Sequence, residues 1–212
     1  MKLTRIILSA AFAFAFSANR GHAEKAATLT PILAKPGKVV VEENFDGAQL
    51  AKSWVANKGD WQIKDGVLVG KEKKSDNHAA VLLLDKPGRN SIIQFSFKLD
   101  GAKSFNLSYN SAKGHMFRIV ISPTGLTINK DKDKKDAKSQ SLALGKAAGK
   151  FEAGKWHSML VEVKGDKVSV QADNGAKAEG SHRELDVDKT GYRFVTSGES
   201  LAVDDVKVWQ TE

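Results

Sequence analysis

Apolar and polar residues alternate with a period of two along most of the chain after residue 37. Clear examples are residues 38–43 (KVVVEE), 60–72 (DWQIKDGVLVGKE) and 91–100 (SIIQFSFKLD). This alternation is typical of β-strands with one face buried and the other in solvent. Asp65-Gly66 stands between two alternating flanks and predicts a two-residue hairpin turn.

The same pattern continues towards the C-terminus and predicts about eleven short strands in all. The later strands fall within residues 78–84, 104–119, 125–130, 156–173, 191–196 and 203–209. Within residues 78–84, Val81 and Leu83 are assigned to the core face. Residues 141–150 (SLALGKAAGK) are also compatible with a helical turn or two. Many short strands separated by turn residues predict an all-β, antiparallel β-sandwich.

The N-terminus has the pattern of a secretory signal peptide. Lys2 and Arg5 precede an apolar run at residues 6–16, which is shorter than the roughly 20 residues that a membrane-spanning helix needs. Small residues surround a plausible cleavage position after Ala23. We therefore predict that residues 1–23 are a signal peptide and that the protein is secreted or periplasmic.

Bulk composition limits the possible functions of the mature chain. Residues 24–37 carry prolines and are predicted to be a linker, followed by a single β-sandwich domain at residues 38–212. Loss of residues 1–23 would lower the net charge from +8 to +5. Because this charge is modest and no aromatic-basic motif accompanies it, no nucleic-acid partner is expected. There is no cysteine, which excludes disulfides, thiolate zinc sites and a cysteine nucleophile.

An unusual polar surface is predicted from residues 104–119 (SFNLSYNSAKGHMFRI). Phe105, Leu107 and Tyr109 alternate with short amide and hydroxyl side chains, where exposed strands more often carry Lys, Glu and Thr. Saccharide hydroxyls donate and accept hydrogen bonds, and Asn, Gln and Ser can do both. If the outward rows of this segment and of residues 91–100 are neighbours on one sheet, the candidate saccharide-binding residues are Gln94, Lys98, Asn106, Ser108, Asn110 and Arg118. The alternative is an ordinary solvated sheet face.

Two histidines are catalytic candidates. His78 and His115 each begin a predicted strand next to a loop. If they meet at the rim of the polar face, an imidazole near neutrality could act as an acid or a base.

Three segments resemble a known family. Residues 154–175 (GKWHSMLVEVKGDKVSVQADNG) are similar to the Trp-His hairpin of laminin-G-like and concanavalin-A-like jelly rolls. Residues 43–72 and 202–209 resemble the two ends of bacterial secreted proteins related to the 3-keto-disaccharide hydrolase domain, which is frequent in planctomycetes. The resemblance covers nearly the whole mature chain. It implies a jelly roll that binds or cleaves carbohydrate, but it assigns no catalytic residue.

The resemblance suggests a possible role for two groups of carboxylates. Glu184, Asp186 and Asp188 are similar to the Glu-X-Asp-X-Glu run of family-16 glycoside hydrolases, but the last position is one methylene shorter, so a solvated strand edge is favoured. Jelly rolls of this type often pair their terminal strands, and some hold calcium there. The weak calcium candidates are Glu43, Asp46, Asp204 and Asp205.

Three classes of function remain open from the sequence. The first is an exported carbohydrate-recognition module that binds a saccharide or glycan. The second is a 3-keto-disaccharide or 3-keto-glycoside hydrolase or lyase. The third is an envelope interaction module that binds no sugar.

Overall fold

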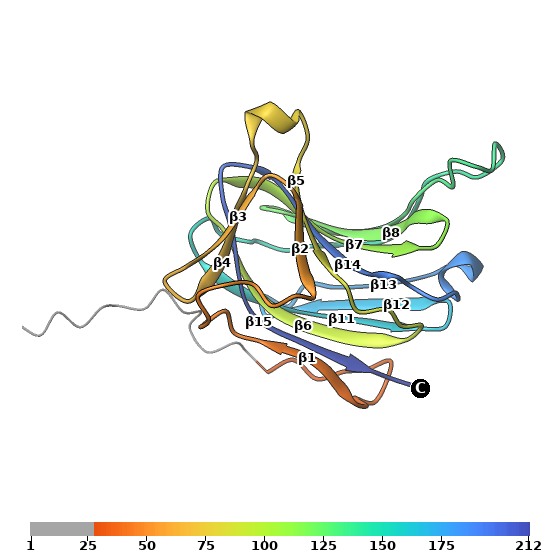
Figure 1. The fold of residues 1–212 in the computed structure, drawn as a ribbon. Helices are drawn as coiled ribbons and strands as arrows, with labels where there is room; N and C mark the ends of the chain where they lie inside the picture. The colour runs from red at the N-terminus through yellow and green to blue at the C-terminus, as the bar shows by residue number, and fades with distance from the viewer. Residues whose placement is uncertain (1–27) are drawn as a thin grey trace, which may run out of the picture.

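The computed structural model describes residues 28–212, so the predicted signal peptide lies outside the described residues. Two antiparallel sheets pack face to face in a sandwich (Figure 1), which confirms the predicted fold class. The described part of the chain holds fifteen strands rather than eleven. None of its helices is long and apolar enough to cross a membrane.

The eight-stranded sheet has the order β13-β12-β11-β6-β15-β4-β3, and β1 pairs with β15. Its strands are β1 (Val39–Glu43), β3 (Asp60–Lys64), β4 (Val67–Lys71), β6 (Ser91–Leu99), β11 (Trp156–Lys164), β12 (Lys167–Ala172), β13 (Lys177–Ser181) and β15 (Leu201–Gln210). Because β1 pairs with β15, the predicted meeting of the terminal strands is confirmed.

The seven-stranded sheet has the order β10-β9-β8-β7-β14-β5-β2. Its strands are β2 (Trp54–Lys58), β5 (Ala80–Leu84), β7 (Ala102–Ser111), β8 (Gly114–Ser122), β9 (Gly125–Lys130), β10 (Leu142–Ala148) and β14 (Gly191–Gly198). The strand β10 occupies the segment for which a helical turn was considered. Two short 3₁₀ turns, η1 (Lys74–Asp76) and η2 (Arg183–Leu185), complete the elements.

The turn chemistry read from the sequence explains the β3–β4 hairpin. Asp65 and Gly66 both have positive φ angles, 53° and 78°. A two-residue turn of type I′ requires this at both central positions, and Asp-Gly is among the pairs that adopt it most easily.

Aromatic side chains from both sheets fill the space between them. Phe95 and Phe97 of one sheet contact Phe105 of the other, each with ring centroids 5.6 Å apart. Phe105 in turn stacks on Phe194 at 5.9 Å. Edge and offset contacts at these distances add to the free energy gained by burying the rings.

Two sequence-based assignments to the core are corrected. Ala80, Leu82 and Leu84 belong to the core cluster between the sheets, whereas Val81 and Leu83 lie on the outer face of β5. Alternation could not decide the register because residues on both faces of this strand are apolar.

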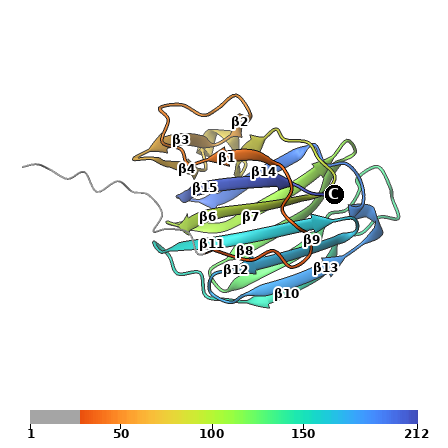
Figure 2. The same cartoon turned by 90° about the horizontal axis from the view of Figure 1, so that it is seen from below.

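The segment predicted to be a linker is held against the eight-stranded sheet. Residues 28–38 cross the outer face of β11 and β12 (Figure 2). The backbone N–H groups of Ile32, Leu33 and Ala34 donate to the carboxylate of Glu162 at 2.8–2.9 Å. Glu162 is fully buried although it belongs to the outer face of β11. The segment therefore covers part of this sheet.

Tyr109 provides a test of the packing directly behind the polar face. Its ring stacks on Phe117 at 4.4 Å, and its hydroxyl is buried without a hydrogen-bond partner among residues 28–212. A buried, unsatisfied hydroxyl costs free energy, so Tyr109→Phe is expected to leave the free energy of unfolding unchanged or raise it by about 1 kcal/mol. Urea unfolding of both proteins measures this. A loss of more than about 1 kcal/mol would show that the hydroxyl has a partner.

Candidate functional site

The six residues predicted to bind saccharide do not share one surface. Gln94 and Lys98 belong to β6 of the eight-stranded sheet, whereas the other four belong to β7 and β8 of the seven-stranded sheet. The chain changes sheet at the turn after β6, so the outward faces of β6 and β7 point away from each other. The expectation of neighbouring rows on one sheet is therefore wrong for Gln94 and Lys98. Lys98 instead lies over the ring of Trp156, 5.4 Å from its centroid.

The outer face of the seven-stranded sheet brings four polar residues into one row. Ser108 of β7 pairs in register with Arg118 of β8 on one side and with Arg193 of β14 on the other. Arg118 also pairs with Asn129 of β9. Residues that flank these positions along the strands, such as Leu107, Tyr109, Phe117, Ile119 and Phe194, belong to the core cluster. We call Arg193, Ser108, Arg118 and Asn129 the polar row.

Two of these four residues were missed by sequence reasoning. The alternation in residues 191–196 places Arg193 on a polar face, and the same pattern holds for Asn129. Pairing of β14 with β7, however, joins segments more than eighty residues apart. Alternation assigns a residue to a face but not to a neighbouring strand, so the row could not be assembled from the sequence.

Ser108 of the polar row and its neighbour Asn110 on β7 are largely enclosed. Ser108 and Asn110 are only 6% and 8% exposed. With its amide oriented to satisfy both neighbours, Asn110 accepts a hydrogen bond from Nε of Arg193 at 3.1 Å and donates to the backbone oxygen of Tyr109 at 3.2 Å. Through this hydrogen bond Asn110 holds Arg193 against the sheet. Asn106 is enclosed as well, since its Oδ1 is buried and has no hydrogen-bond partner among the described residues.

Arg118 is fixed by a buried carboxylate. Its Nε donates to Asp131 Oδ1 at 2.9 Å, and its Nη2 contacts the same oxygen. The Arg118 side chain remains 43% exposed. Asp131 begins the connection between β9 and β10, which rises beside this face while the η1 loop rises at the opposite end (Figure 1).

The face is hollowed along β8, β9 and β10. One depression of about 340 Å³ is lined by Arg118, Asn129 and Asp131 together with residues of β10. A second, of about 450 Å³, continues from Val120 towards Thr127 and Lys146. Both depressions include Val120, so they adjoin, and the polar row runs into the first.

His115 lies on β8 beside the polar row, three residues before Arg118. It pairs in register with Asn110. Partial burial lowers the pKa of His115 below the ordinary 6.5, and the positive charges of Arg193, Arg118 and Lys134 lower it further, while Asp131 opposes them. A lowered pKa favours the neutral imidazole, which is the form that can accept a proton.

His78 does not meet His115. His78 precedes β5 at the end where Ala80 pairs with Thr196, and Thr196 pairs with Phe105. That is the far end of β7 from Asn110, beside which His115 lies. Nδ1 of His78 is instead 2.7 Å from the backbone oxygen of Ala79. The expectation that the two histidines share one rim is wrong, because they begin strands at opposite ends of the sheet.

The carboxylates of residues 184–188 are held by cations. The segment begins with the 3₁₀ turn η2 rather than an extended strand. Glu184 pairs with Lys130 at 2.8 Å and Asp186 with Arg89 at 3.0 Å. Arg89 holds the pKa of Asp186 below its ordinary value. These side chains do not form a pair of facing catalytic carboxylates.

The predicted calcium ligands do not assemble. Glu43 accepts a hydrogen bond from the backbone of Phe45 at 3.0 Å, and Asp204 accepts one from Asp205 at 2.8 Å. Within residues 28–212 no group of three or more acidic, histidine or cysteine side chains lies close enough to hold a metal ion. Pairing of the terminal strands thus brings the segments together without making a calcium site.

A family model and several solved structures match this chain. The model of the 3-keto-alpha-glucoside-1,2-lyase-like domain matches residues 41–193. No curated protein matches the sequence.

Three solved structures share the fold at low sequence identity. A non-specific endo-β-1,3(4)-glucanase from family GH16 is 13% identical, with a TM-score of 0.63 over 92% of this chain and 98% of its own. A laminarinase from Flavobacterium sp. UMI-01 is 15% identical, with 0.58 over 82% and 100%. The carbohydrate-binding module CBM66 from Bacillus subtilis is 13% identical, with 0.52 over 75% and 92%. These likenesses establish the jelly-roll fold.

Proposed function

The chain belongs to the family of 3-keto-alpha-glucoside-1,2-lyase-like domains, and we propose that it is an exported protein that binds a saccharide on the outer face of its seven-stranded sheet. The observation that carries the proposal is the polar row, which combines donors and acceptors beside a hollow. Export is inferred from the signal-peptide pattern of residues 1–23.

The chemistry of the row suits sugar hydroxyls. Ser108 and Asn129 can donate and accept, and Arg118 supplies donors in a fixed plane. The pair with Asp131 holds Arg118 in place before any ligand arrives, so less conformational entropy is lost on binding. Solved sandwiches with this fold include a carbohydrate-binding module and a glucanase, and these likenesses support a saccharide as the ligand.

The replacement Asn129→Ala tests the location of the site. Loss of a neutral hydrogen-bonding group costs about 0.5–1.5 kcal/mol, so saccharide affinity is expected to fall by about two- to tenfold. A glycan array first identifies a ligand, and calorimetry then compares the variants. The matched control is Gln94→Ala, on the opposite sheet, which is expected to bind normally. Equal weakening by both changes, or no bound glycan, would contradict the proposal.

A second candidate function is elimination from a 3-keto-α-glucoside, which the neutral His115 beside two guanidinium groups favours. A ketone at C3 acidifies the hydrogen on C2. His115 would take that proton, the C1–O bond would break, and a C1=C2 double bond would form. The departing sugar oxygen then takes up a proton. Arg193 and Arg118 are positioned near His115 to stabilise negative charge that develops on the C3 oxygen.

A further inference from the structure

Arg193 differs from two other arginines of the described chain in having no carboxylate partner. Arg118 is paired with Asp131, and Arg89 is paired with Asp186. Arg193 makes its hydrogen bond from Nε to the amide of Asn110, and no acidic side chain among residues 28–212 forms an ion pair with it. Its two Nη groups therefore remain available, and the neutral Asn110 fixes their direction without cancelling the charge.

The neighbourhood of His115, to which Arg193 belongs, carries more positive than negative charges. Arg193, Arg118 and Lys134 all act electrostatically on His115. Asp131 is the acid that opposes them there, and it is already paired with Arg118. Lys134 belongs to the connection between β9 and β10, which rises beside the face (Figure 1). An anion that approaches Arg193 thus meets an attractive field.

An apolar shelf borders Arg193 on the side away from Ser108. Leu83 of β5 pairs with Arg193, and Val55 of β2 pairs with Leu83. Leu83 is only partly buried, and Val55 is 47% exposed. The face therefore combines an unpaired guanidinium, hydroxyl-binding groups and an apolar surface. A sugar ring that carries an anionic group is complementary to all three features. Its anionic group can pair with the guanidinium, its hydroxyls can bind the polar groups, and its apolar C–H groups can pack on the shelf.

We infer that this face selects anionic saccharides, with Arg193 binding a carboxylate or sulfate group while the rest of the polar row binds hydroxyls. This inference rests on the proposed function and adds the substrate class. A guanidinium binds a planar carboxylate through two parallel hydrogen bonds, which gives both affinity and geometric selectivity. A neutral saccharide would leave the Arg193 Nη groups without this partner.

The decisive comparison uses an oligogalacturonate and its methyl ester, which differ in charge but not in sugar identity. Calorimetry on the intact protein is expected to give at least tenfold tighter binding of the acid, and the preference should shrink as salt is added. In Arg193→Gln the ratio of the two affinities is expected to fall to near one. Arg193→Lys keeps the charge and should retain part of the preference, while Lys98→Gln, on the opposite sheet, should retain it fully.

Each outcome separates this inference from the proposed function. Equal binding of acid and ester by the natural protein would overturn the inference and leave saccharide binding standing. An unchanged acid preference in Arg193→Gln would also overturn it. Binding of neither ligand, nor of any glycan on an array, would overturn the proposed function itself. A sulfated neutral oligosaccharide tested in parallel supports the inference if it binds more tightly than its unsulfated form, and it then identifies sulfate as the recognised group.

Discussion

Replacement of His115 by glutamine is expected to slow the cleavage of a 3-keto-α-glucoside by a factor of about 10²–10⁴, the usual contribution of a general base. The same change should alter KM only a few-fold, because the polar row still holds the sugar. The natural protein should show kcat/KM that rises with pH and then levels off. Because burial and nearby cations lower the pKa of His115, the midpoint of that rise should lie below 6.5.

The sign of this pH dependence follows from the role of the imidazole. A general base must be deprotonated to act, so activity is lost as the pH falls through the lowered pKa. His78→Gln is the matched control, since His78 lies at the other end of the sheet, and it is expected to keep full activity. Absence of turnover by the natural protein, or an equal loss in His78→Gln, would exclude His115 as the base and leave saccharide binding as the function.

The fold could be predicted from the sequence because the local signals in the sequence agree with one another. Period-two alternation and the Asp65-Gly66 turn both indicate antiparallel strands, and the structure is an antiparallel sandwich. The resemblance to jelly rolls added the pairing of the terminal strands, which the structure confirms. Errors arose where alternation carries no information. Residues 78–84 are apolar on both faces, so the pattern could not show that Leu83 points outward.

Only part of the candidate site could be predicted from the sequence, because the site depends on which strands are neighbours in the sheet. Asn106, Ser108 and Asn110 were placed on one face by their spacing alone. Adjacent segments in the sequence are often neighbours in a sheet, which led to the inclusion of Gln94 and Lys98. The jelly roll breaks that expectation, since β7 lies between β8 and β14 while β6 belongs to the other sheet. Arg193 enters the site only through this long-range pairing.

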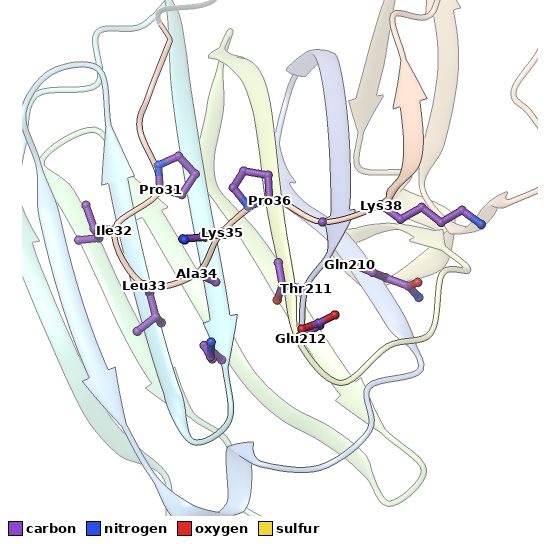
Figure 3. Close-up of a pocket in the computed structure, with 12 residues that line it drawn as sticks. Pro31, Ile32, Leu33, Ala34, Lys35, Pro36, Lys38, Gln210, Thr211 and Glu212 are labelled. Carbon is purple, nitrogen blue, oxygen red and sulfur yellow. The ribbon is translucent and has the colours of Figure 1, made fainter.

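A buried carboxylate makes most of the hydrogen bonds that hold residues 30–34 on the sheet. Glu162 accepts three successive backbone N–H groups from residues 32–34, and Gln171 donates to the backbone oxygen of Thr30 at 2.9 Å. Further along, the backbone N–H of Gln210 donates to the Lys38 oxygen at 2.9 Å. Figure 3 shows the segment and the C-terminal residues 210–212 around a cavity of about 880 Å³. The attachment therefore has two ends, with an open space between them.

Glu162→Ala is expected to release this segment and to lower the free energy of unfolding by about 2–4 kcal/mol, since hydrogen bonds to a charged group contribute about 1.5–3 kcal/mol each and are not additive. The loss is limited because the freed N–H groups become hydrated once the segment leaves the sheet. Hydrogen exchange at residues 32–34 should accelerate strongly, while exchange in β7 and β14 stays slow.

Glu42→Ala is the matched control for this change, because Glu42 is 71% exposed and pairs only with Lys207 among the described residues. Exposed pairs of this kind contribute about 0–1 kcal/mol, so its effect on guanidinium unfolding should be several-fold smaller. Saccharide affinity should persist in Glu162→Ala, since the segment lies on the opposite sheet from the polar row. If residues 32–34 stay protected in Glu162→Ala, other contacts hold the segment, and the carboxylate is not its anchor.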